Sequence, residues 1–186
     1  MSREAPRWLA PASGTVALGF GVGLVAFYTW GRAIPAHHVA TVVAEVPVDP
    51  NTVGALLSDI ERRPSWRPGV TRIGRVEDTS DGRAVWRELG PGGDRFDFVV
   101  LEAQPERLVI ETARPEDIGM RAMWTWTVEA HGAGSRIALT EDGSVDNELF
   151  RGVWTVTDGP WEAIERDLDA FVRALGVDAP EVARQD

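Results

Sequence analysis

Two residue types are missing from the 186-residue sequence, which contains neither cysteine nor lysine. The absence of cysteine excludes disulfides, thiolate catalysis, and zinc or iron–sulfur sites with cysteine ligands. Because all 19 basic residues are arginine, Schiff-base chemistry and the phosphate-binding lysine of a Walker motif are also excluded. Several of the commonest catalytic and cofactor-binding groups are therefore absent from this chain.

Histidine is scarce, with only His37, His38 and His131 in the chain. These three residues do not have the spacing of metal ligands on one helix or strand. We therefore interpret them as solvent-exposed side chains and predict neither a metal nor a cofactor.

The charge balance is strongly acidic, with a formal net charge of −10. An acidic surface repels nucleic-acid phosphates and anionic lipid headgroups, so we predict no nucleic-acid partner. Hydrophobic residues make up 44% of the chain, which is enough for one folded domain with a core.

A long uncharged segment near the N-terminus runs over residues 8–31, between Arg7 and Arg32. Its 24 residues suffice for one helix across a bilayer core. Trp8 and Trp30 lie at its ends, where aromatic side chains favour the lipid–water interface. We predict a single transmembrane helix with the lipid bilayer as partner, preceded by a flank at residues 1–7.

Two other interpretations of this segment are a cleaved signal peptide and a buried helix. Bulky aromatic residues stand where a cleavage site needs small ones, and the all-round apolarity with many glycines disfavours a core helix. The small positive excess on the N-terminal side predicts a cytoplasmic N-terminus and an extracytoplasmic domain.

Small residues form rows at i+4 spacing within the segment, and such rows let membrane helices pack closely. They are typical of contact with other transmembrane helices of a membrane complex, and a Gly/Ala-rich anchor without a partner is the alternative. The residues are Ser13, Ala17, Gly19, Gly21 and Gly23.

Beyond a linker at residues 32–37, the pattern of residues 38–176 predicts one α+β domain, followed by a flexible tail at 177–186. Alternating apolar and polar residues with turn signals between them predict seven strands. Two short helices follow the first strand, and a third precedes a long amphipathic helix that begins at Pro160 and ends at Gly176. We expect a curved antiparallel sheet wrapped on that long helix. The predicted strands are 38–48, 70–77, 83–89, 95–103, 107–112, 120–130 and 135–143.

In this order of elements the sequence resembles the SRPBCC superfamily, also described as START-like, Bet v 1-like or polyketide cyclase/dehydrase-like, with a helix-grip fold. The resemblance covers residues 38–176. It rests on VDPNTVGALLSDIERRPSWRPGV at 48–70, MWTWTVEAHGAGSRIALTEDGSV at 123–145 and ELFRGVW at 148–154. It implies an apolar cavity between sheet and helix that binds lipids, quinones or similar molecules, while some members are enzymes.

Large apolar side chains are the candidate cavity residues, although an ordinary packed core explains them equally well. They are Trp86, Phe96, Phe98, Met123, Trp124, Trp126, Phe150, Trp154, Trp161 and Phe171. The remaining acid/base candidates are the carboxylates on strands: Glu88, Asp97, Glu102 and Glu129. By alternation Asp97 is expected on the solvated outer face of the sheet, whereas Glu88 shares a face with Trp86 and has a route into the cavity as a general base.

We predict no catalytic residue and favour a membrane-tethered, non-enzymatic module that binds a hydrophobic small molecule. One alternative is an accessory subunit of a multi-subunit membrane complex, for example respiratory or photosynthetic. A polyketide cyclase-like enzyme is the second alternative, and it requires an acid/base group that faces the cavity.

Overall fold

The computed structural model describes residues 12–79, 81–115, 119–157, 159–178 and 181–185, with side chains described from Gly23 onward. The first element is the helix α1 (Ala12–Ala33), so the predicted span at 8–31 begins outside the described residues. Within the described part of the chain, no helix is long and apolar enough to cross a membrane.

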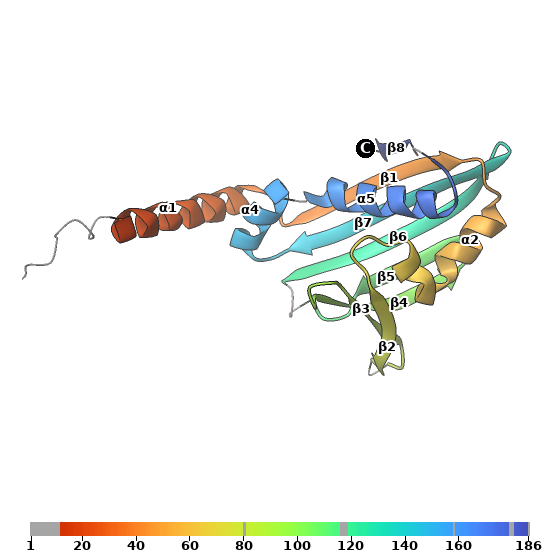
Figure 1. Cartoon of the computed structure of the whole chain (residues 1–186), viewed down its shortest axis with the longest axis horizontal. Coiled ribbons are helices and arrows are strands. Elements are labelled where there is room, and N and C mark those ends of the chain that lie inside the picture. The colour runs from red at the N-terminus through yellow and green to blue at the C-terminus, as the bar shows by residue number, and fades with distance from the viewer. Residues whose placement is uncertain (1–11, 80, 116–118, 158, 179–180, 186) are drawn as a thin grey trace, which may run out of the picture.

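The centre of the domain is one antiparallel sheet with the strand order β2-β3-β4-β5-β6-β7-β1-β8 (Figure 1). Bulges in β2 and β4 interrupt the pairing and contribute to the curvature of the sheet. The strands are β1 (His37–Val46), β2 (Arg72–Asp78), β3 (Ala84–Leu89), β4 (Arg95–Gln104), β5 (Arg107–Thr112), β6 (Met120–His131), β7 (Gly134–Val145) and β8 (Val182–Gln185).

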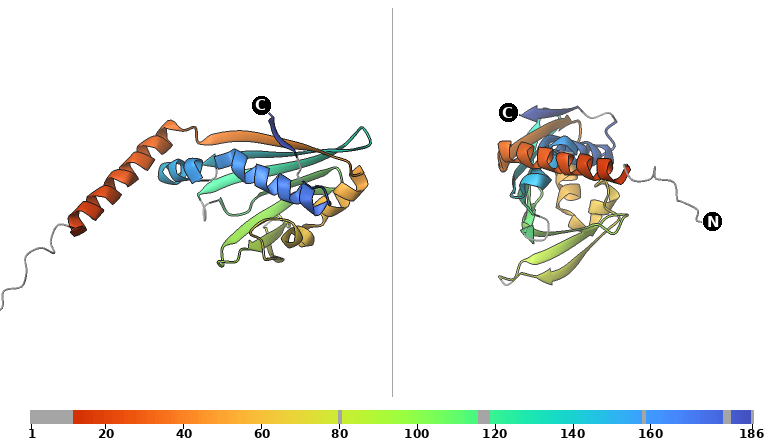
Figure 2. Two further views of the ribbon diagram at one scale, coloured as in Figure 1. Left: turned by 45° about the horizontal axis from the view of Figure 1, so that its top comes forward. Right: turned by 90° about the vertical axis from the view of Figure 1, so that its left-hand side faces the viewer.

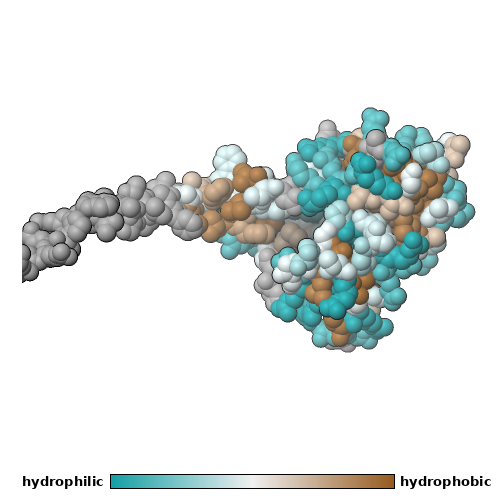
Figure 3. Space-filling view, viewed as in Figure 1, coloured by the Kyte–Doolittle hydropathy of each residue, from teal (hydrophilic) through white to brown (hydrophobic). Residues whose placement is uncertain are grey.

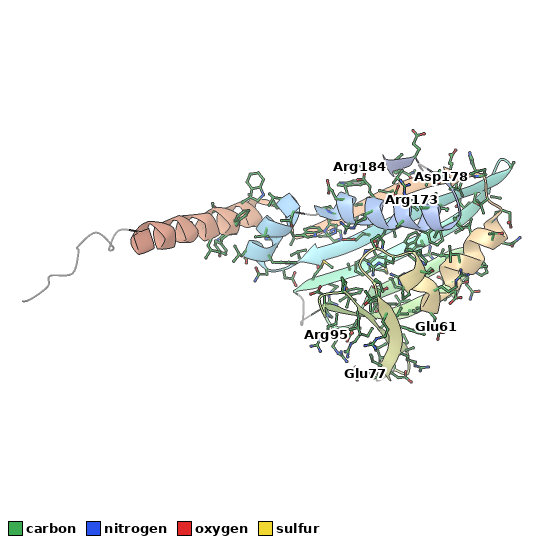
Figure 4. All side chains as sticks on the ribbon, viewed as in Figure 1. Glu61, Glu77, Arg95, Arg173, Asp178 and Arg184 are labelled. Atoms are coloured by element: carbon green, nitrogen blue, oxygen red, sulfur yellow. The ribbon has the colours of Figure 1, made fainter. Side chains whose placement is uncertain are left out.

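Strand β8 corrects the expected seven-stranded sheet and the expected flexible tail at 177–186. Its backbone pairs with β1 between Thr41 and Ala44. Arg184 of β8 also donates to Glu165 of α5 (Gly159–Ala174), with Nε and Oε1 2.6 Å apart. Figure 4 labels Arg184 beside that helix. Pairing with β1 and the charge-assisted bonds of Arg184 therefore hold this short edge strand, whose four residues VARQ have no alternation of apolar and polar residues that would predict it.

One face of the sheet carries the core, and helix α5 lies across it (Figure 1). Two further helices cover the same face: α2 (Pro50–Ser58) and the 3₁₀ helix η1 (Ile60–Ser65), which follow β1 in the sequence and precede β2. The carboxylate of Asp49 caps α2. The buried cluster joins these helices to inward strand residues and includes Val42, Leu57, Trp66, Phe98, Leu108, Trp126, Leu139, Leu168 and Phe171. The helix-grip architecture expected from the sequence is confirmed.

Helix α1 projects from one end of the sheet, where it packs against the short helix α4 (Glu148–Thr157) (Figure 2). The two backbones are so close that a Cβ atom on Gly152 would stand 2.2 Å from the carbonyl oxygen of Phe27. A Cβ on Gly31 would meet the carbonyl oxygen of Glu148 at 1.7 Å. Glycine is therefore required on both sides of this helix contact.

Arg151 fixes this junction from the inside. Its buried guanidinium donates from Nε to the carbonyl oxygen of Gly31 at 2.7 Å and from Nη1 to the carbonyl oxygen of Val145. The first bond satisfies a carbonyl in the last turn of α1, and the second holds the end of β7. One side chain thus joins α1, α4 and the sheet.

The small-residue rows of the N-terminal helix lie mostly outside the part whose side chains are described. This applies to Ser13, Ala17, Gly19 and Gly21. At Gly23, a Cβ atom would have nothing within 4 Å, so this face of α1 is open within the chain.

Candidate ligand-binding cavity

The apolar face of the sheet is packed at one end and hollow at the other. In α5, Leu168, Phe171 and Val172 belong to the packed core, whereas Ala163 and Asp167 line a cavity of about 540 Å³. The cavity is bounded by the loop after η1, the β3–β4 turn, the start of β6, the end of β7, and helices α4 and α5. It is large enough for a small organic ligand.

Aromatic and aliphatic side chains form much of the cavity wall. Phe96 and Trp124 meet edge to face with ring centroids 5.6 Å apart, and Trp154 of α4 closes the side next to α1. Met120 and Ile164 complete this apolar surface. Such a wall favours a flat or branched apolar group by removing it from water.

A buried charge network lies at one side of the cavity around Glu88. Arg63 is 2% exposed and donates from Nε to Oε1 of Glu88 at 2.6 Å. Arg67 donates to the other oxygen of Glu88 and, from Nε, to Oδ2 of Asp167 at 3.0 Å. Two cations and two anions therefore compensate one another.

The two arginines of this network have opposite pKa shifts. Burial lowers the pKa of the Arg63 guanidinium, and the positive charge of Arg67 lowers it further, against the opposing attraction of Glu88. For Arg67, burial also acts to lower the pKa, but the charges of Asp167 and Glu88 outweigh it and raise the pKa. Arg63 also lies over the rings of Trp66 and Phe98, each 5.3 Å from its Cζ.

A second buried carboxylate, Glu141, reaches the cavity from β7, which lies four strands away from the strand β3 that carries Glu88. Its Oε2 accepts a hydrogen bond from Nε1 of Trp124 at 2.7 Å, and its Oε1 lies 2.8 Å from Nε2 of His38. The ring of His38 lies 5.0 Å from that of Trp154. Glu141 is therefore fixed by side chains from β1 and β6.

The ring of His38 has space because residue 143 is glycine. A Cβ atom at Gly143 would stand 2.9 Å from Cε1 of His38. Any larger residue at this position would push the imidazole away from Glu141.

The ten candidate cavity residues fall into different environments. Phe96, Trp124 and Trp154 line the cavity. Phe98, Trp126 and Phe171 are fully packed in the core, and Trp86 and Trp161 pack against it while partly buried. The packed-core interpretation is thus correct for several of them.

Two of the ten expectations are corrected. Met123 is 38% exposed because strand alternation turns it to the face opposite Trp124. Phe150 is 42% exposed on α4. Neither belongs to the cavity wall.

The carboxylates follow strand alternation. Glu88 enters the cavity, which was the less favoured of its two expected positions. Asp97 faces away from it and accepts two hydrogen bonds from Arg87 on the neighbouring strand, at 2.6 and 2.7 Å. Glu102 and Glu129 lie on the outer side of the sheet.

The histidines agree with the expectation of exposure only in part. His37 and His131 are exposed, but the side chain of His38 is 15% exposed and is bound to Glu141. Within the described ranges, no three His, Asp or Glu residues are arranged to hold a metal ion.

Glu141 and Arg63 are site residues that were not predicted from the sequence. Strand alternation carried the signal for Glu141, because residues 137 and 139 of the same strand are apolar and point inward. Arg63 carried no such signal, since it lies in a 3₁₀ turn whose orientation depends on tertiary packing.

Comparison with known proteins supports the resemblance to the SRPBCC superfamily. A sequence model of the family described as polyketide cyclase / dehydrase and lipid transport matches residues 37–176. No curated protein matches the sequence.

Solved structures share the fold at low identity. The Thermus thermophilus protein TTHA0849 has a TM-score of 0.57 and 20% identity over 76% of this chain and 100% of its own. A START superfamily protein from Mycobacterium smegmatis has a TM-score of 0.52 and 16% identity, over 75% of this chain and 99% of its own. Norcoclaurine synthase from Thalictrum flavum, in complex with dopamine and hydroxybenzaldehyde, has a TM-score of 0.55 and 16% identity, over 75% of this chain and 88% of its own.

Proposed function

Because this chain belongs to the polyketide cyclase / dehydrase and lipid transport family of the SRPBCC superfamily, we propose that it binds a hydrophobic small molecule in the cavity beneath α5. The observation that carries this proposal is the half-filled interior: one end of the sheet is packed, while the other leaves about 540 Å³ lined by Phe96, Trp124 and Trp154. A cavity of this size can enclose a small organic molecule, and its aromatic wall would remove the apolar surface of that molecule from water.

Filling the cavity tests this function. Ala163 lines the cavity, so Ala163→Trp would occupy the space of the ligand. Ala174 lies exposed on the same helix, and Ala174→Trp is the matched control. We expect apolar compounds in organic extracts of the purified full-length protein and of the control, detected by mass spectrometry, and their loss in Ala163→Trp. Equal recovery from all three proteins, or none from any, would contradict binding in this cavity.

We also propose that the N-terminal segment tethers the domain to a membrane. The sequence of residues 8–31 supports this, as does an exposed apolar surface where α1 meets α4 (Figure 3). That surface includes Leu24, Val25, Phe27, Phe150, Val153 and Val156. Apolar side chains that cluster at a helix junction mark a contact surface for lipid or for another protein.

Contact with other membrane helices, as in an accessory subunit of a larger complex, is the alternative use of this surface. Migration of the detergent-extracted protein as a monomer would count against a subunit role, whereas co-migration with defined partners would support it.

An enzyme of the polyketide cyclase type is a second candidate function, favoured by the two buried carboxylates Glu88 and Glu141 on the cavity wall. A compound retained with unchanged mass after incubation supports binding alone. A compound released with the mass of one water less would support a cyclase or dehydratase.

A further inference from the structure

The two buried glutamates on the cavity wall, Glu88 and Glu141, differ in their partners. Glu88 is contacted by two guanidinium groups, from Arg63 and Arg67, which are charged at any physiological pH. In the described part of the chain, Glu141 receives its hydrogen bonds from an indole and an imidazole. An indole carries no charge, and a neutral imidazole can donate through Nε2.

The difference in partners matters because the side chain of Glu141 is buried. Only 4% of the Glu141 side chain is exposed, so water contributes little to stabilising its charge. The hydrogen bonds from Trp124 and His38 fix both oxygens in place, and each oxygen retains capacity to accept another bond. The residue also lines the cavity, so the remaining acceptor capacity is available to a bound molecule.

We propose that Glu141 is the polar anchor of the ligand site and selects a hydrogen-bond-donating head group, with a protonated amine preferred over a hydroxyl. The rest of the ligand is a flat apolar body that lies between Phe96, Trp124 and Trp154. The cavity wall also carries Arg67, Arg95 and Arg166, so the selection is made beside Glu141. A carboxylate head group at that position is disfavoured, because two like charges would meet at a side chain that is only 4% exposed. This inference rests on the proposed binding function and specifies the chemistry of its ligand.

The strand geometry shows that the anchor is built into the fold. Trp124 and Glu141 are paired residues of β6 and β7, and His38 reaches Glu141 from β1 on the other side of β7. Gly143 leaves room for the imidazole ring. Three residues on three adjacent strands thus position the carboxylate of Glu141 at the cavity wall.

Three probes with the same rings and different head groups test the proposal: naphthylethylamine, naphthylethanol and naphthylacetate. Binding to the full-length protein is measured by isothermal titration calorimetry. We expect the amine to bind about tenfold more tightly than the carboxylate, with the alcohol between them, since a hydrogen bond to a buried charge is worth at least this factor. A carboxylate that binds as tightly as the amine would overturn the anchor role, without need of any variant.

Glu141→Gln removes the charge and keeps the shape, so it should bring the amine and carboxylate affinities to within about twofold while naphthylethanol still binds. Asp142→Asn is the matched control: it removes the neighbouring carboxylate on the outer face of the same strand and should keep the tenfold ratio. Glu141→Gln with an unchanged ratio would overturn the proposal.

Binding of the same probes to Ala163→Trp distinguishes the anchor role of Glu141 from ligand binding in the cavity. If all three probes bind equally and Ala163→Trp abolishes them, the cavity binds ligands and Glu141 is not the anchor. If no probe binds to the wild-type protein, the anchor role of Glu141 fails, and the extracts of the wild-type and Ala163→Trp proteins decide separately whether the cavity binds an apolar molecule.

Discussion

Arg63 shows how much one buried side chain depends on a single partner. Its guanidinium is stacked between aromatic rings and receives compensation from Glu88, while Arg67 has Asp167 as a second anion. Among the described residues, loss of the Glu88 charge would leave the buried Arg63 with no anion in contact, whereas Arg67 would keep Asp167.

Glu88→Gln should therefore lower the free energy of unfolding by about 3 kcal/mol, because removing one partner of a buried pair strands the other charge. Urea denaturation followed by circular dichroism measures this change. Glu102→Gln is the control, since Glu102 and Arg107 form an exposed pair and surface pairs contribute less than about 1 kcal/mol. Similar losses in both variants would contradict the special role of the Glu88 network.

Strand alternation made some site residues predictable and others not. It places Asp97 outside, Glu88 inside and Met123 outside, and applied consistently it also places Glu141 inside. Whether an inward aromatic lines a cavity or fills a core is a different matter. Phe96 lines the cavity and Phe98 is in the core, although they share one face of one strand.

Among the elements, the α1–α4 contact is the one that depends most on glycine. The backbone of Phe27 lies where a side chain of residue 152 would stand, and no flexible side chain is available to move aside. The α1–α4 contact therefore tolerates no Cβ at this point unless the helices separate.

Gly152→Ala should destabilise this contact by about 2 kcal/mol, the typical cost of overpacking a rigid site. Hydrogen exchange of the amides over residues 27–33 should accelerate as α1 separates from α4. Gly23→Ala is the matched control: it lies in the same helix pair with open space around it, and alanine favours a helix by up to about 1 kcal/mol over glycine. Accelerated exchange in the control alone, or in neither variant, would contradict the proposed contact.

Helices and strands with a clear hydrophobic period can be predicted well from the sequence, whereas those without one cannot. The bounds of β5 and the long amphipathic helix α5 follow directly from period-2 and 3.6-residue patterns. Strand β8 lacks such a pattern, because its four residues are held by pairing with β1 and by Arg184. Its existence depends on contacts far away in the sequence.

For the molecule as a whole, helix α4 connects the proposed tether with the proposed site. One of its side chains, Trp154, lines the cavity, while Phe150, Val153 and Val156 are exposed beside α1. If α1 enters a bilayer, its contact with α4 places this exposed face at the lipid surface. The cavity would then lie one helix away from the membrane, within reach of an apolar molecule that leaves the lipid.

The absence of cysteine allows this arrangement to be tested with one introduced thiol. Val156→Cys, labelled with an environment-sensitive fluorophore, should show a blue-shifted and stronger emission when the full-length protein is reconstituted into phosphatidylcholine vesicles, because the label leaves water for lipid. His131→Cys is the control, since the turn between β6 and β7 lies at the end of the sheet opposite α1 (Figure 1). Its emission should not change on reconstitution. An unshifted label at residue 156 in protein that floats with the vesicles would show that α4 faces away from the bilayer, and its apolar surface would then be free for a protein partner.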